Sequence, residues 1–186
     1  MLVVSVSFHI KTIASTPSTV LLPLPTPEAS FNLGAPSPET YAVAVDKKQV
    51  EEERKAEEER RRVARENTIN NLVNYLRRNG SPIATYDYAA QIVDLSAANG
   101  ADYKVVVAIM GVESGFCRAS FWHNCFGYLN GVKYSSYTSA LNDLVPKVSR
   151  QYAARYGWNF EALAKAYGQH EWERTSANMR WFASRI

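Results

Sequence analysis

The chain has 186 residues and a formal net charge of +3, so it is long enough for one ordinary globular domain plus additional segments. The small net charge, and the lack of an arginine-rich stripe interleaved with aromatic residues, argue against a nucleic-acid-binding protein. Six of the eight prolines lie in the first 45 residues, whereas all four tryptophans lie in the last 65. The composition therefore places the globular domain at about residues 68–186.

Residues 1–45 are predicted to be disordered. The first ten residues are apolar but carry no positive charge ahead of the apolar run, so they make only a poorly marked export signal. They are also far too few to span a bilayer, and we expect no integral membrane span. The rest of the segment is rich in proline, serine and threonine with few charges, a composition that cannot bury enough apolar surface to order itself.

Residues 46–67 are predicted to form a charged spacer helix. Eight acidic and eight basic residues alternate in blocks between positions 46 and 66. Glu51 precedes Lys55 by four positions, which is the favourable order for an ion pair along a helix. A coiled coil is the alternative, but the apolar residues available for its seam are few: Val50, Ala56, Val63 and Ala64. A solvated helix fits this composition better.

The domain at 68–186 is expected to be mainly α-helical, with at most a short β-hairpin. No alternating strand pattern exceeds a few residues, whereas apolar residues recur at helical spacing throughout. We expect helices that begin at the capping residues Thr68, Ser81, Asp102 and Asn159, and a last helix that carries Met179, Trp181 and Phe182. A further helix around Leu144 contains Pro146, which should bend it or lie near its start. Residues 134–137 are the candidate extended piece.

Glu113 is the most informative single residue. It ends a helix whose residues Val105, Val106, Ile109 and Met110 are predicted to be buried. A carboxyl group at the C-terminal end of a buried helix lies at the negative end of the helix dipole and partly out of water, and both effects raise its pKa. Such a group can act as a general acid near neutral pH. The alternative is an ordinary ion pair with an arginine such as Arg118.

Cys117 and Cys125 lie eight positions apart in the segment that follows Glu113. In an oxidising compartment they would close a small loop and stabilise it by about 2 to 3 kcal/mol. In the cytosol they would remain two thiols, and of the two states we expect the disulfide. A zinc site is disfavoured because His123 is the only other ligand type nearby. We therefore expect no metal and no cofactor.

Three segments, taken in chain order, resemble enzymes that cleave bacterial cell walls. V-A-I-M-G-V-E-S-G-F is similar to the helix-to-loop signature of the lysozyme-like superfamily, in which the glutamate is the catalytic acid. N-C-F-G-Y, with the following G-V-K-Y-S-S-Y-T-S-A-L-N-D-L, resembles autolysin glucosaminidases and the related endo-β-N-acetylglucosaminidase domains. K-A-Y-G-Q is similar to the A-Y-N-x-G segment of soluble lytic transglycosylases, although Gly168 replaces the asparagine and their G-L-M-Q glutamine is missing.

The resemblance implies a lysozyme-like helical domain and a set of site residues. Glu113 would be the catalytic acid, and Tyr167 would hydrogen-bond to it or to a substrate acetamido group. The substrate-binding candidates are Ser114, Trp122, Phe126, Gly127, Tyr128 and Tyr137. Of these, Phe126, Gly127 and Tyr128 would form a cleft wall, and Trp122 and Tyr137 would stack on sugar rings. Each aromatic residue has an alternative role in core packing, and Ser114 has one in capping the turn.

The expected function is a peptidoglycan glycosidase that cleaves the β-1,4 glycan strand, outside the cell or in its envelope. A hydrolase usually needs a second carboxylate, and the candidates are Asp143, Glu161, Glu171 and Glu173. The substrate's own acetamido group can replace it. Lytic transglycosylation and a non-catalytic wall-binding module remain alternatives. The expected partner is the peptidoglycan strand, and we expect a monomer.

Overall fold

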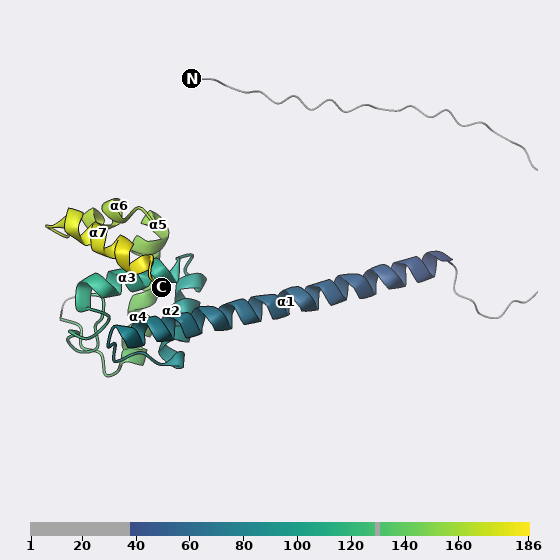
Figure 1. The fold of residues 1–186 in the computed structure, drawn as a ribbon, viewed down its shortest axis with the longest axis horizontal. Coiled ribbons are helices and arrows are strands. Elements are labelled where there is room, and N and C mark those ends of the chain that lie inside the picture. The colour runs from purple at the N-terminus through teal and green to yellow at the C-terminus, as the bar shows by residue number, and fades with distance from the viewer. Residues whose placement is uncertain (1–37, 129–130) are drawn as a thin grey trace, which may run out of the picture. The chain divides into compact units, whose positions relative to one another are not determined.

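The computed structural model describes residues 38–128 and 131–186, and this part of the chain is mainly α-helical (Figure 1). Residues 46–186 form one compact unit. The helices are α1 (Pro38–Arg78), α2 (Tyr86–Ala98), α3 (Tyr103–Ser114), α4 (Tyr137–Val148), a π-helical turn (Ser149–Ala153), α5 (Ala154–Tyr156), α6 (Phe160–Ala166) and α7 (Trp172–Ala183). The mainly α class predicted from the sequence is therefore confirmed for the described residues.

α1 corrects two predicted boundaries. The helix runs without a break through Thr68, so the charged helix and the first helix of the domain are one element. Thr68 caps nothing: its hydroxyl donates to the carbonyl of Ala64 at 2.9 Å, a bond that a threonine makes inside a helix. The helix also begins at Pro38 rather than Asp46. Residues 1–37 of the segment predicted to be disordered lie outside the described residues.

The two parts of α1 differ in burial. From residue 46 to 67 nearly every side chain is exposed, and ion pairs within the helix link Arg54 to Glu51 and to Glu58. From Ile69 onward the helix contributes Leu72 and Leu76 to the core, both fully buried. The change from exposed to buried side chains lies within α1, close to the predicted start of the globular domain at residue 68, and no helix end marks it.

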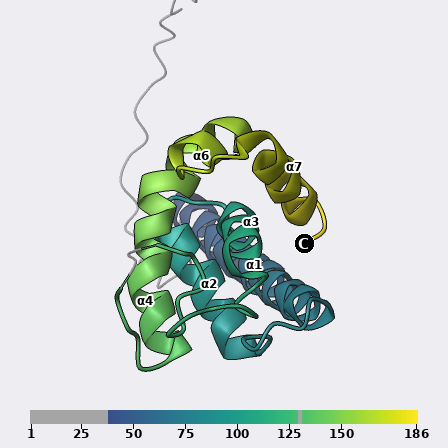
Figure 2. The same cartoon turned by 90° about the vertical axis from the view of Figure 1, so that its left-hand side faces the viewer.

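α3 is the central element of the domain. The six residues Val105 to Met110 are all fully buried, which an isolated amphipathic helix would not show. α3 packs on α7 and on α2, and Figure 2 shows the other helices arranged around it. Asp102 caps its N-terminus as predicted, with a bond of 2.9 Å from the Lys104 backbone N–H to its carboxylate. Glu113 lies in its last turn, also as predicted.

Other helix ends differ from the sequence-based prediction. α2 begins after Thr85, whose hydroxyl accepts from Tyr88, so Ser81 and Pro82 belong to the preceding turn. Pro146 lies inside α4 near its C-terminal end, and a π-helical turn follows directly. A proline ring removes one backbone donor from the helix, which is consistent with the change of hydrogen-bond pattern there. Asn159 caps α6 as predicted.

The extended piece expected at 134–137 is not a strand. The residue pair Phe121 and Asn124 forms one isolated antiparallel bridge, and among residues 38–128 and 131–186 this is the whole of the β structure. Tyr137 instead begins α4, because Ser136 and Ser139 form a reciprocal capping box at its N-terminus. The long segment between α3 and α4 is therefore held by a disulfide and by side-chain hydrogen bonds rather than by strand pairing, and these contacts also shape the candidate site.

Candidate active site around Glu113

Glu113 presents to a cavity a carboxyl group that forms no ion pair with the described residues. Burial alone raises its pKa to about 7, far above the ordinary value for a glutamate. The nearest polar partner is the side-chain amide of Gln169, which donates to Oε1 at 2.7 Å. Within the described residues no lysine or arginine forms an ion pair with Glu113, so the predicted alternative of a pair with Arg118 is not seen. The group is able to hold and deliver a proton near neutral pH.

The cavity beside Glu113 has a volume of about 210 Å³. Its lining residues come from the end of α3 and from the segment that follows: Glu113, Ser114, Ala119, Phe121, Trp122, Asn124, Gly127, Gly131 and Val132. Two of them, Phe121 and Trp122, are aromatic side chains that are 83% and 57% exposed. An acid and exposed aromatic rings that line one cavity suit a sugar chain, because sugar rings present apolar faces and hydroxyl edges together.

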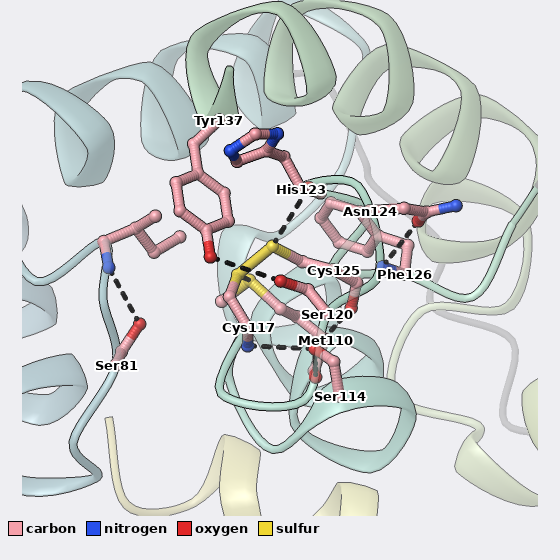
Figure 3. Close-up of a disulfide and its surroundings, with 11 residues drawn as sticks. Ser81, Met110, Ser114, Cys117, Ser120, His123, Asn124, Cys125, Phe126 and Tyr137 are labelled. Atoms are coloured by element: carbon pink, nitrogen blue, oxygen red, sulfur yellow. Dashed lines mark hydrogen bonds between the residues drawn. A yellow bond between two sulfur atoms is a disulfide. The ribbon is translucent and has the colours of Figure 1, made fainter. Parts of the chain in front are cut away.

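Ser114 anchors the segment that forms the cavity (Figure 3). Its hydroxyl is buried, lies 2.7 Å from the carbonyl of Cys125, and accepts the backbone N–H of Cys117 at 2.9 Å. These bonds tie both cysteines to the end of α3. Ser114 therefore holds the loop, which agrees with its predicted alternative role, and it makes no hydrogen bond with Glu113 in this structure.

A disulfide links Cys117 to Cys125 and closes the loop. Both cysteines are buried, and the sulfur atoms lie beside Met110 of α3 (Figure 3). Trp122 and His123, within the closed loop, adopt left-handed backbone angles with φ of 52° and 64°. Such angles are uncommon for residues with side chains and need a surrounding structure that enforces them. The disulfide and the Ser114 bonds provide that constraint.

Asn124 shapes the next turn. Its side-chain oxygen accepts the backbone N–H of Phe126 at 3.1 Å, and its amide donates to the carbonyl of Tyr128 at 2.6 Å. The turn brings Gly127 against the acid. A Cβ atom added to Gly127 would overlap Oε2 of Glu113 and lie 3.3 Å from its Cδ, and the backbone there has a φ of 60°. Only glycine fits this position without displacing the carboxyl group.

Tyr167 lies close to the acid but binds elsewhere. Its hydroxyl donates to the carbonyl of Phe126 at 2.6 Å, so it supports the turn that carries Gly127. The negative charge of Glu113 adds to burial in raising the pKa of Tyr167. Its ring packs on Tyr152 at 4.6 Å between centroids, and Tyr152 packs on Tyr128 at 6.0 Å. In this structure Tyr167 positions the loop rather than hydrogen-bonding to Glu113.

The predicted site residues thus fall into two groups. Glu113, Ser114, Trp122 and Gly127 meet at the cavity. Phe126, Tyr128, Tyr137 and Tyr167 are not among its lining residues. Phe126 is fully buried in the core rather than forming a cleft wall with its ring.

Tyr137 contacts the loop without lining the cavity. Its ring packs edge-on against His123, and its hydroxyl lies 3.2 Å from that of Ser120 (Figure 3). A half-buried ring held in this way has the packing role that was its alternative.

None of the candidate second carboxylates lines the cavity. Asp143 accepts hydrogen bonds from Lys147 and Tyr134, both at 2.7 Å, and these lower its pKa. Glu161 and Glu171 form exposed ion pairs within their own helices or turns, and Glu173 is exposed. Glu113 is therefore the only carboxylate among the described residues that line this cavity.

Gln169, Asn124 and Phe121 are site residues that the sequence analysis did not identify. Gln169 lies 56 positions after its partner Glu113, so no local pattern connects them. Asn124 stands in the N-C-F-G-Y segment three positions before Gly127, and asparagine often organises a turn by bonding to backbone groups near it in sequence. The turn at Asn124 could therefore have been predicted from the sequence.

Within the part of the chain that the structure describes, no cluster of His, Cys, Asp and Glu is arranged to hold a metal ion. None of the helices in residues 38–128 and 131–186 is both long and apolar enough to cross a membrane.

Comparisons with models of protein families, with curated proteins and with solved structures found no match to this chain.

Proposed function

We propose that this protein cleaves the β-1,4 glycan strand of peptidoglycan with Glu113 as general acid, in a domain related to the lysozyme-like superfamily. The observation that carries the proposal is the partly buried carboxyl group at a cavity lined by exposed aromatic rings. Cleavage of a glycosidic bond needs a proton delivered to a poor leaving group, and a glutamate with a pKa of about 7 is still protonated in about half of the molecules at pH 7.

The residues around the acid take supporting roles in this proposal. Trp122 borders the sugar-binding face, and Gly127 lets the backbone approach both the acid and the substrate. Gln169 holds one carboxyl oxygen, which leaves the proton on the other oxygen to face the glycosidic oxygen. The Cys117–Cys125 disulfide accords with a protein that acts outside the cell or in its envelope, where disulfides persist.

Lytic transglycosylation is the second candidate, and the lone carboxylate favours it. A hydrolase that works with two carboxylates needs its second one within about 10 Å of the first across the bond. Glu113 has no such companion among the residues that line the cavity. An acid that first protonates the leaving group and then accepts a proton from a sugar hydroxyl would suffice for intramolecular transfer. Hydrolysis assisted by the substrate's acetamido group would need one acid as well.

The decisive experiment is mass spectrometry of soluble fragments released from purified peptidoglycan by the full chain. Glu113→Gln is compared with Glu173→Gln, which removes an exposed carboxylate outside the cavity. We expect fragments from the wild type and from Glu173→Gln, and a loss of roughly 100-fold or more in Glu113→Gln. Anhydro ends identify a transglycosylase and reducing ends a hydrolase.

Other outcomes would contradict the proposal. Equal release by Glu113→Gln would remove the role given to that residue. Wall binding by the folded protein without any release of fragments would support a non-catalytic module instead.

A further inference from the structure

A second cavity lies between the C-terminal ends of α1 and α7. Its volume is about 470 Å³, and it shares no lining residue with the cavity at Glu113. It is lined by Tyr75, Arg78, Asn79, Trp181 and Arg185. Two arginines, two aromatic rings and no acidic residue make a composition quite different from that of the first cavity.

The two arginines are not neutralised. Neither Arg78 nor Arg185 forms an ion pair with an acidic residue in the described part of the chain. Arg185 lies over the ring of Trp181, with its guanidinium carbon 4.9 Å from the ring centroid. That contact places the guanidinium beside the ring without using its N–H groups in an ion pair, so they remain for another partner. Two such groups around one cavity attract an anion.

Tyr75 adds an independent observation. Its side chain is 97% buried, and its hydroxyl has no hydrogen-bond partner. Buried hydroxyl groups nearly always have one, so an orphaned hydroxyl at a cavity wall marks a place where a ligand atom is expected. Both Arg78 and Arg185 act on its pKa, in opposition to burial, so both guanidinium groups lie near this hydroxyl.

We propose that this cavity binds an anionic oxygen group, a phosphate or a carboxylate, carried on a flat or cyclic body. Arg78 and Arg185 hold the charged oxygens, and the Tyr75 hydroxyl donates to one of them. Trp181, which is 52% exposed and lines the cavity, offers the part of its ring that Arg185 does not cover to the cyclic body. The site is independent of the reaction proposed for Glu113, and its test requires no glycan cleavage.

The proposal is tested by NMR titration of the full chain, with the indole N–H of Trp181 as the reporter. The probes are phenyl phosphate and phenylacetate, which join a ring to either anion, and benzyl alcohol, which joins it to an uncharged group. We expect saturable shifts with one or both anions and none with the alcohol. Tighter binding of phenyl phosphate assigns the site to phosphates, and tighter binding of phenylacetate assigns it to carboxylates.

Variants then separate binding from folding. The double variant Arg78→Gln/Arg185→Gln should weaken anion binding about tenfold or more, whereas Arg180→Gln, which changes an exposed arginine of α7 outside the cavity, should not. Tyr75→Phe should weaken binding without lowering the melting temperature, because the hydroxyl has no partner within the protein. The proposal fails if neither anion shifts Trp181 saturably, if benzyl alcohol binds equally well, or if the double variant binds as the wild type does.

Discussion

At the scale of single residues, the pKa of Glu113 couples the site to the stability of the fold. Burial raises that pKa from 4.5 to about 7, so the folded protein binds a proton more tightly than the unfolded chain does. The stability gained from this proton is fully present below pH 4.5 and is lost as the pH rises through 7. Above that pH the fold must hold a partly desolvated negative charge.

We therefore predict that Glu113→Gln stabilises the protein at pH 8 but has little effect at pH 4. A glutamine resembles the protonated acid and does not ionise. After allowance for the partial exposure of the group, the expected gain at pH 8 is about 1 to 2 kcal/mol. Urea denaturation of both proteins at the two pH values measures it, and identical pH dependence in the two proteins would contradict the assigned pKa.

Gly127 carries a second prediction at this scale. Gly127→Ala should cost about 1 to 2 kcal/mol for its left-handed backbone, and it should also displace the Glu113 carboxyl group, since the new methyl group overlaps Oε2. The Glu113 pKa, followed by carbon NMR of the labelled carboxyl group, should move. Gly100→Ala is the matched control, because Gly100 has a φ of 69° with open space around its Cβ position. Gly100→Ala should lower the stability but leave the Glu113 pKa unchanged. If the Glu113 pKa does not move in Gly127→Ala, the close approach of Gly127 to the carboxyl group is refuted.

At the scale of elements, the loop between α3 and α4 depends on its disulfide rather than on regular structure. The Cys117–Cys125 bond closes a segment in which Trp122 and His123 hold left-handed angles. We predict that reduction lowers the free energy of unfolding by about 2 to 3 kcal/mol. Denaturation with and without a reductant measures this. The double variant Cys117→Ala/Cys125→Ala should unfold like the reduced protein and should not respond to the reductant; a response would mean that the reductant acts elsewhere.

The elements that could be predicted from sequence were those whose ends depend on neighbouring residues. Asp102 and Asn159 cap their helices through bonds to backbone groups two or three positions away, and the apolar run before Glu113 is equally local. The prediction that Thr68 caps a helix was wrong, because a threonine hydroxyl can donate to a carbonyl inside a helix as readily as it can accept from a free N–H at the start of one. The Glu113–Gln169 bond joins two distant segments, and only the packing of the folded domain brings them together.

At the scale of the whole molecule, the charged part of α1 and the compact domain make separate contributions. The exposed stretch before Ile69 pairs its charges mainly within the helix, and exposed pairs of that kind add little to stability. Its hydrogen bonds to the domain, among the side chains that the structure describes from residue 46 onward, lie at its end, where Arg65 forms two with Asp94 and Glu66 accepts one from Tyr86. The core begins at Ile69.

This division predicts that a chain shortened to residues 65–186 keeps the stability of the full protein. The shorter chain retains every residue of the hydrophobic core together with the Arg65–Asp94 and Tyr86–Glu66 bonds. Thermal unfolding should give a melting temperature within about 4 °C of that of the full chain, which corresponds to less than about 1 kcal/mol. A chain shortened to residues 72–186 is the comparison, because it also loses Ile69 and should unfold at a clearly lower temperature. Equal destabilisation of both shortened chains would show that the charged helix supports the domain directly.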